Sequence, residues 1–278
     1  MSALRGARAR FRRARLAVLL APALLAGCIS EEREVELGDQ IAANLNSRIP
    51  LVRDAPVNLY VNELGRLLAR HSARPGLEYH FYVVDTDGVN AFALPGGHIY
   101  VNRGLIERTR DVSELAGVLA HEIGHVAARH GAKSLQRQMR TSGMSSLLYR
   151  VILGREPILD QDALKMGGQL WAASHSRADE AEADQLAVGY LIETGVDPRG
   201  MLTLFGTLME EERKSQMETV EWFSTHPSTE RRLDRTRQQI LERLPETAEE
   251  LARNNASYPD FLHRLHELPP APVMIELQ

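Results

Sequence analysis

The stretch ELAGVLAHEIGHVAAR, residues 114–129, constrains the fold most, because as a helix it is apolar on nearly every side. Such a helix belongs at the centre of a domain. Asp111 and Glu114 have the spacing of a capping box, and Gly131 is a natural stop, so the helix is expected between them. Its strongly polar interior side chains lie in HEIGH, and burying them is costly unless a partner satisfies them.

A metal ion would be such a partner. His121 and His125 are four residues apart and differ by about 40° around a helix, so both imidazoles point the same way. They can reach one zinc ion at about 2.0–2.1 Å. Glu122 lies to one side, where it is better placed to accept a proton from water than to bind the ion. The alternative interpretation is two core histidines satisfied by neighbouring groups.

The acidic stretch SRADEAEADQL, residues 176–186, supplies the next candidates. On a helical wheel Glu180 and Asp184 lie about 40° apart on the apolar side, Glu182 faces solvent, and Asp179 is at the boundary. An unpaired buried carboxylate is costly. We therefore expect Glu180 to be the third zinc ligand and Asp184 to orient a ligand imidazole. An acidic cluster stabilised by the helix dipole would explain Glu182 and Asp179, but not the inward pair.

The N-terminus reads as an export signal. Arginines followed by LAVLLAPALLAGC are typical of a secretory signal peptide, here residues 1–27. Leu25-Ala-Gly-Cys28 resembles the lipobox of bacterial lipoproteins, in which the cysteine is acylated; an ordinary signal anchor with an incidental cysteine is the alternative. Arg12-Arg13 leaves both Sec and Tat export open. Cys28 is the only cysteine, which excludes an internal disulfide, a cysteine zinc ligand deeper in the fold and a thiol nucleophile.

Charge and composition exclude other classes of protein. Residues 1–27 carry six arginines and no acid, so 27 of the 33 basic residues remain against 37 acidic ones, a net charge of −10. An acidic body without a basic stripe argues against a nucleic-acid partner. Aromatic residues make up only 5% of the chain, which favours an aliphatic core of packed helices. No stretch after the signal is long and apolar enough to span a bilayer.

The chain changes its periodicity in a definite order. Residues 31–73 predict two amphipathic helices, with a break near 48–50 and a second start at Asp54. In residues 78–102, apolar and polar side chains alternate on either side of a Pro-Gly-Gly turn, which predicts a small antiparallel sheet. Helical patterns follow from Asp111 almost to the end. We expect a predominantly helical α+β domain over 28–245 and a polar C-terminal tail over 246–278. Residues 136–168 suit a lid or, preferably, an ordinary helical hairpin.

Five stretches, taken in order, resemble a known family. They are ELGDQIAANL, NAFALPGGHIYVNRGLI, HEIGHVAARH, SRADEAEAD and STHPSTERRL. Together they are similar to the zinc metallopeptidases that include HtpX, BepA, LoiP and the CAAX prenyl proteases. The absence of later membrane helices and of a helical-repeat domain favours the compact, LoiP-like lipoproteins. The resemblance implies a zincin-like domain with a central HExxH helix and one Zn²⁺ per chain, held by His121, His125 and Glu180.

The resemblance also draws attention to two later residues, His226 and Arg232, because the family has a His-Pro motif followed by an arginine. It implies that His226, together with Arg232, stabilises the oxyanion as a catalytic group, or that His226 occupies the fourth zinc position in a resting state. From the sequence alone, a histidine before a proline is usually a turn residue.

These observations predict a zinc endopeptidase of the bacterial cell envelope that cleaves unfolded or misassembled envelope proteins. A lipid on Cys28 would anchor it to a membrane, and Ile29 after that cysteine favours the periplasmic face of the outer membrane. The strand HIYVN, residues 98–102, could pair with an extended substrate at a sheet edge, or it is simply structural.

The rival function is a zinc-bound periplasmic chaperone or assembly factor with latent or incidental proteolysis. The intact Glu122 favours the enzyme, since a scaffold needs no general base. A purely structural zinc site is disfavoured, because such sites normally have four protein ligands, often cysteines.

Overall fold

The structure is a computed structural model that describes residues 29–141, 166, 175–214, 221–227, 230–244 and 250–272. Its helices are α2 (Glu31–Asn46), α3 (Ala55–Ala69), α4 (Arg103–Ile106), α5 (Val112–Ala127), α6 (His130–Thr141), α9 (Arg177–Thr194), α10 (Arg199–Lys214), α11 (Glu221–Thr225), α12 (Glu230–Arg243) and α13 (Tyr258–His266). Three strands, β1 (His80–Val84), β2 (Ala91–Leu94) and β3 (His98–Asn102), form one sheet. The predominantly helical α+β class is confirmed.

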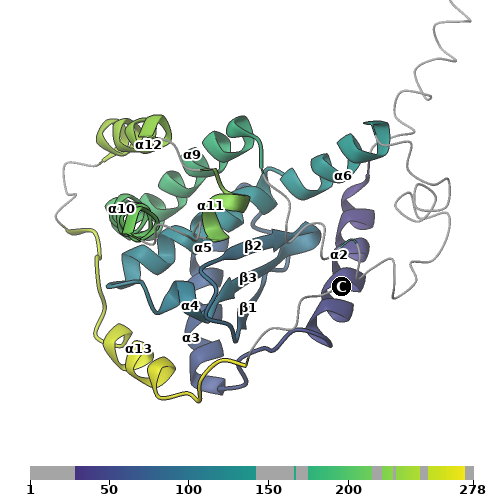
Figure 1. Ribbon diagram of the computed structural model, residues 1–278. Coiled ribbons are helices and arrows are strands. Elements are labelled where there is room, and N and C mark those ends of the chain that lie inside the picture. The colour runs from purple at the N-terminus through teal and green to yellow at the C-terminus, as the bar shows by residue number, and fades with distance from the viewer. Residues whose placement is uncertain are drawn as a thin grey trace, which may run out of the picture.

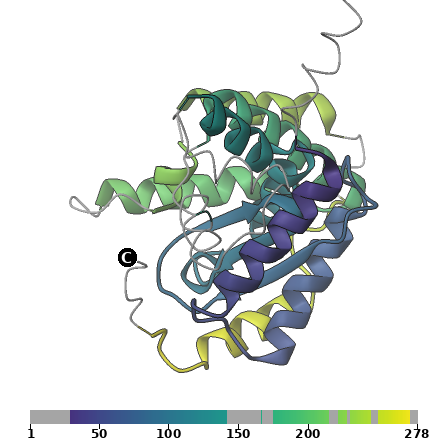
Figure 2. The same ribbon diagram turned by 90° about the vertical axis from the view of Figure 1, so that its right-hand side faces the viewer.

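The sheet lies between α2 on one face and α3 with α5 on the other (Figures 1 and 2). Successive strand residues alternate between the two sides, as the pleat requires. Phe81 and Val83 pack with α3 and α5 in the larger core. Val84 and Tyr100 pack with α2 in the smaller one. The predicted helices over 31–73 are confirmed, and Asp54 caps α3 by accepting a hydrogen bond from the Val57 amide at 3.1 Å.

The sheet is mixed rather than wholly antiparallel. β2 and β3 form the expected antiparallel pair through a turn in which Gly96 and Gly97 have φ of 82° and 101°. The chain reverses twice between β1 and β3, so β1 runs parallel to β3 on its other side. β3 is therefore the central strand. The prediction that HIYVN pairs with substrate as an edge strand is wrong, since both of its edges are already paired.

Helix α5 is the buried centre of the domain, with every residue from Val112 to Val126 buried. Asp111 caps it by accepting a hydrogen bond from the Glu114 amide at 3.1 Å, as predicted. The predicted stop at Gly131 is wrong, because Arg129, at φ 59°, turns the chain and α6 starts at His130. That left-handed conformation costs roughly 1–2 kcal/mol. Ion pairing of Arg129 with the buried Glu34 at 2.6 Å offsets it.

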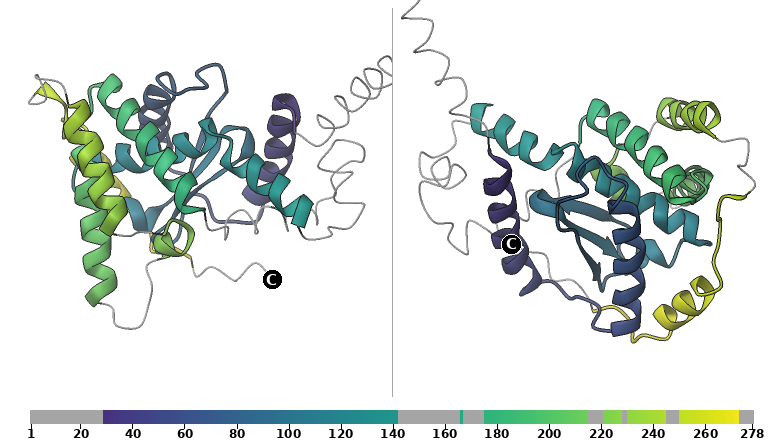
Figure 3. Two further views of the ribbon diagram at one scale, coloured as in Figure 1. Left: turned by 90° about the horizontal axis from the view of Figure 1, so that it is seen from above. Right: turned by 180° about the vertical axis from the view of Figure 1, so that it is seen from behind.

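Helices α9 and α10 pack on α5, and α12 packs on both of them, as the view from above shows (Figure 3). The expected polar tail is not wholly separate: α13 packs on α3 and buries Tyr258, Phe261 and Leu265 in the larger core. Most of the predicted lid or hairpin at 136–168 lies outside the described residues. Within the described ranges, no helix has the length and apolar character needed to cross a membrane.

Candidate metal centre

Three elements bring the predicted site residues together. Helix α5 carries His121, Glu122 and His125, α9 carries Glu180, and His226 directly follows α11; each of these side chains is at most 2% exposed. The approach of α9 to α5 depends on Gly124, where an added Cβ would lie 2.9 Å from the Ala183 carbonyl oxygen. A capping box of Ser176 and Asp179 begins α9 and places Glu180 in its first turn.

Four side chains each point one donor atom at a common space. The Nε2 atom of His125 lies 3.0 Å from Nε2 of His121 and 3.3 Å from Oε1 of Glu180. Nδ1 of His226 lies 3.3 Å from His121 Nε2 and 3.1 Å from Glu180 Oε1. One donor from each of the four residues falls within 4.8 Å of every other.

This donor set fits a zinc ion. Two ligands bound to one zinc at about 2.0–2.1 Å are at most about 4.2 Å apart, and all four distances above satisfy that limit. Three imidazole nitrogens with one carboxylate oxygen also match the ligand types that zinc prefers. All four residues are buried, so a bound ion would replace the water that these donor atoms have lost.

Asp184 and Arg232 support the ligands from behind. Oδ1 of Asp184 lies 3.0 Å from Nδ1 of His121, the nitrogen that faces away from the cluster. Arg232 donates to both Asp184 oxygens at 2.6 and 2.8 Å, and its Nη1 lies 2.5 Å from Oε2 of Glu180. Burial would raise the pKa of the Asp184 carboxyl, but the charge and hydrogen bonds of Arg232 lower it to about 2. Asp184 is therefore ionised where it faces Nδ1 of His121.

His125 has a corresponding support that the sequence interpretation missed. Its Nδ1 lies 2.9 Å from Nδ1 of the fully buried His130. Nε2 of His130 in turn lies 3.3 Å from Glu182 and 3.5 Å from Asp179. Glu182 was expected to be a purely solvated carboxylate; its side chain is 54% exposed, yet it reaches His130. On a continuous helix His130 would face elsewhere, and only the left-handed turn at Arg129 directs it back.

Two aromatic rings complete the walls of the site. The ring of His175 lies 3.9 Å from that of His125, and burial together with the charge of His226 lowers its pKa to about 3. Trp222 stacks on His226 at 4.2 Å and accepts a hydrogen bond from its amide through the backbone carbonyl. Thr225 hydrogen-bonds Asn90 and so ties this segment to the start of β2. Neither His175 nor Trp222 was identified from the sequence.

Glu122 lies beside the four donors, and among the described residues neither of its buried carboxylate oxygens has a hydrogen-bond partner. Its Oε1 lies 3.5 Å from Nε2 of His226. Burial raises the pKa of the Glu122 carboxyl above its ordinary value, against the opposing charges of His226 and His121. A buried, unbonded carboxylate with a raised pKa has the properties of a group that takes up and releases protons.

A buried HExxH helix facing a glutamate on a second helix defines the zinc metallopeptidase class. The family assignment agrees: residues 56–240 match the family model for Peptidase family M48, and the chain belongs to this family. The matched region is therefore a zinc-dependent metallopeptidase domain.

The chain is also similar to curated proteins that are named as proteases. Beta-barrel assembly-enhancing protease of Yersinia pestis is 30% identical over 223 residues, which cover 78% of this chain and 46% of the relative. Metalloprotease LoiP of Escherichia coli (strain K12) is 30% identical over 227 residues, which cover 79% of this chain and 85% of the relative. Mitochondrial metalloendopeptidase OMA1 of Schizosaccharomyces pombe is 30% identical over 203 residues, which cover 69% of this chain and 54% of the relative. The chain thus spans less than half the length of the first relative.

Proposed function

We propose that the whole protein is a zinc endopeptidase. The observation that carries this proposal is the convergence of four donor atoms beside Glu122, a carboxylate that no described residue hydrogen-bonds. A site built only to hold the fold together has no use for such a carboxylate, since burying it without a partner costs free energy.

Each residue has a distinct role. His121, His125 and Glu180 would hold the zinc ion, which would supply a Lewis acid toward water and the scissile carbonyl. Glu122 accepts a proton from the attacking water on a carboxylate oxygen and passes it to the leaving amine. Because no neighbour occupies its oxygens, both are available for these transfers.

His226 and Arg232 have different roles. The distances from His226 Nδ1 to His121 and Glu180 match those between the other donors, so we assign it to the fourth position of the resting site. It then gives way to substrate, and its Nε2, near Glu122, can stabilise the oxyanion. Arg232 is turned toward Asp184 and Glu180, which supports a positioning role rather than the expected contact with the oxyanion.

The N-terminus and the names of the relatives support a location and a class of substrate. A signal peptide over 1–27 would direct export of the chain. A lipid on Cys28 would then hold the domain of 28–245 at the bacterial envelope, on the periplasmic face of the outer membrane. A relative named for enhancing β-barrel assembly supports envelope proteins as substrates. We propose that unfolded or misassembled envelope proteins are cleaved there as quality control.

The proposed activity is tested by incubating the full chain with an unfolded model protein and with its folded form. Cleavage of the unfolded form, lost in a chelator and restored by zinc, is the expected result. Absence of cleavage despite one bound zinc would favour the chaperone or assembly factor, a function that His226 in the fourth position also suits. Labelling with a radioactive fatty acid in cells, lost in Cys28→Ala, tests the anchor.

A further inference from the structure

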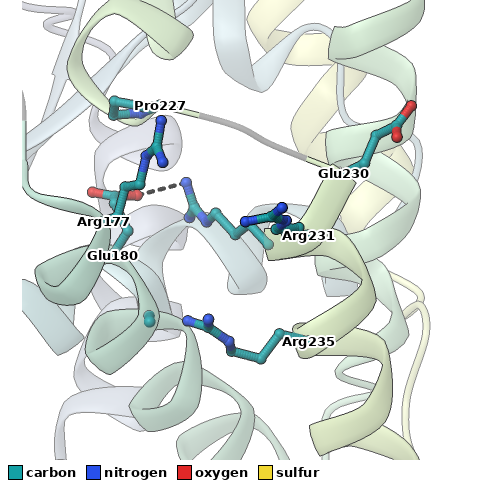
Figure 4. A pocket seen from close by; sticks show the side chains of 8 residues that line it. Arg177, Glu180, Pro227, Glu230, Arg231 and Arg235 are labelled. Carbon is teal, nitrogen blue, oxygen red and sulfur yellow. Dashed lines mark ion pairs between the residues drawn. The ribbon is translucent and has the colours of Figure 1, made fainter.

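A pocket of about 500 Å³ lies beside Glu180, between the first turn of α9 and the first two turns of α12, next to Pro227 (Figure 4). Its size is that of a site for one or a few side chains rather than for a whole protein. The proposed mechanism makes no use of it. It nevertheless borders two elements of the metal centre, since Glu180 is a member of the donor cluster and Pro227 follows His226.

The pocket is lined by guanidinium groups. Arg177 reaches it from α9 and Arg231 and Arg235 from α12, and Figure 4 shows the three turned toward the same space. The fourth arginine, Arg232, is committed to Asp184 and Glu180. Glu230 is the remaining acid in the lining, and its carboxylate points away from the arginines.

Several exposed arginines among the described residues form ion pairs, which the three outer arginines do not. Arg237 pairs with Asp234 at 2.8 Å, and Arg264 pairs with Asp54 at 2.7 Å. Within the described ranges, no ion pair or hydrogen bond joins Arg177, Arg231 or Arg235 to any carboxylate. Like charges held around one space repel each other, and an anion that enters the space relieves this repulsion.

We propose that this pocket binds a carboxylate of the substrate peptide, close to the bond that is cleaved. The inference rests on the proposed endopeptidase and adds a substrate class to it: chains with an acidic side chain, or a terminal carboxylate, near the scissile bond. The planar fork of an arginine matches a carboxylate with two parallel hydrogen bonds. Because Glu180 lines both the pocket and the metal centre, the bound carboxylate lies only a few residues from the reacting carbonyl.

A peptide fits these observations better than a lipid headgroup does. The pocket is bordered by the metal centre, where a substrate backbone must pass. Apart from its first 27 residues the chain carries a net charge of −10, which repels an anionic bilayer as a whole while the local arginines still attract one carboxylate. Screening by salt should weaken that local attraction.

The test uses pairs of unfolded peptides. In one set the two members of a pair have Glu or Gln at one position near the cleavage site, and each position is tested in turn. In a second set the two members differ only in having a free or an amidated C-terminus. We expect kcat/KM to be about tenfold higher for Glu at one position, a factor typical of a charge-assisted hydrogen bond. Preference for a free C-terminus instead would assign the carboxylate to the chain end. In the Arg231→Gln/Arg235→Gln variant this ratio should fall toward one. A matched variant, Arg66→Gln/Arg237→Gln, loses the same charge outside the pocket and should keep the ratio.

A binding experiment separates this proposal from the proposed function. The Glu122→Gln variant, loaded with zinc, is titrated with the same labelled peptides and with vesicles that contain anionic lipid. Tighter binding of the acidic peptide, lost in Arg231→Gln/Arg235→Gln, supports the pocket even if the wild type cleaves nothing. Cleavage with equal rates and affinities for Glu, Gln and both chain ends overturns the pocket and leaves the peptidase intact. Vesicle binding that depends on these arginines, without a peptide preference, also overturns it.

Discussion

The Nδ1 atoms of His125 and His130 lie 2.9 Å apart, with both rings buried in the domain. Since Nε2 of His125 faces the other three donors, its Nδ1 proton is free to bond His130. Nε2 of His130 then faces Glu182 and Asp179, which favour a proton on that atom. His130 therefore fixes the orientation and the tautomer of His125.

Replacing His130 should weaken zinc binding. We expect His130→Ala to raise the zinc dissociation constant about 10- to 100-fold, the usual effect of losing a group that orients a metal ligand. Competition with a chromogenic chelator measures this constant. His263→Ala removes an exposed histidine on α13 and serves as the control. Equal affinities for both variants would contradict the assigned role of His130.

The pair of Arg232 and Asp184 should be strongly coupled. Arg232→Gln leaves the buried Asp184 without its two guanidinium hydrogen bonds, and we expect a loss of about 3–5 kcal/mol in the free energy of unfolding. Asp184→Asn/Arg232→Gln should lose less than the sum of the two single variants. Urea unfolding of the zinc-free proteins in excess chelator measures the free energy of unfolding of the wild type, the two single variants and the double variant. A double-variant loss equal to the sum of the single losses would contradict the coupling.

Replacing glycine by alanine should have opposite effects on the stability of the fold at two positions. A Cβ at Gly38 would lie 2.0 Å from the carbonyl oxygen of Pro95, so Gly38→Ala should push α2 off the turn and destabilise the fold by about 1–3 kcal/mol. A Cβ at Gly206 in α10 would meet nothing within 4 Å, so Gly206→Ala should stabilise the fold by about 0.5–1 kcal/mol. Thermal unfolding distinguishes them; a stable Gly38→Ala would contradict the close packing of α2.

Buried tyrosines predict a loss of stability at high pH. Burial raises the pKa of Tyr79 to about 12, and it raises the pKa of Tyr258 and Tyr100 as well. An unfolded tyrosine ionises near pH 10, so the protonated form stabilises the folded state fully below about pH 10. That contribution is lost as the pH rises toward the folded pKa. Urea midpoints should stay level between about pH 8 and pH 10 and fall between about pH 10 and pH 12, and they should fall less steeply in Tyr79→Phe.

Local periodicity explains what the sequence could predict. His121 and His125 share one helix face, as do Glu180 and Asp184, and the structure brings these two faces together. The relevant information lies within a single turn of helix in each case. Tyr258, Phe261 and Leu265 also form a helical stripe, but the polar residues around them hide it, so the sequence predicts only a polar tail where α13 packs on the core.

Contacts between distant segments explain why the sequence did not predict the other features of the fold and the site. His130 acts on His125 only because Arg129 adopts a left-handed conformation, which its ion pair with Glu34, nearly a hundred residues earlier, stabilises. The parallel pairing of β1 with β3 depends on which side of the hairpin remains open to it, and no residue pattern within a strand encodes that choice. His175 reaches the site beside α9 without any spacing that marks it.

Comparing the wild type with Glu122→Gln is the most direct test of the central claim that this domain is a zinc peptidase with Glu122 as its proton acceptor. Both proteins are incubated with an unfolded model substrate, and the zinc bound to each is counted. Glu122 is not one of the four clustered donors, so both should hold one zinc ion. We predict that the wild type cleaves and that the variant is at least about a hundredfold slower. Equal cleavage by both, with zinc bound to both, would contradict the account.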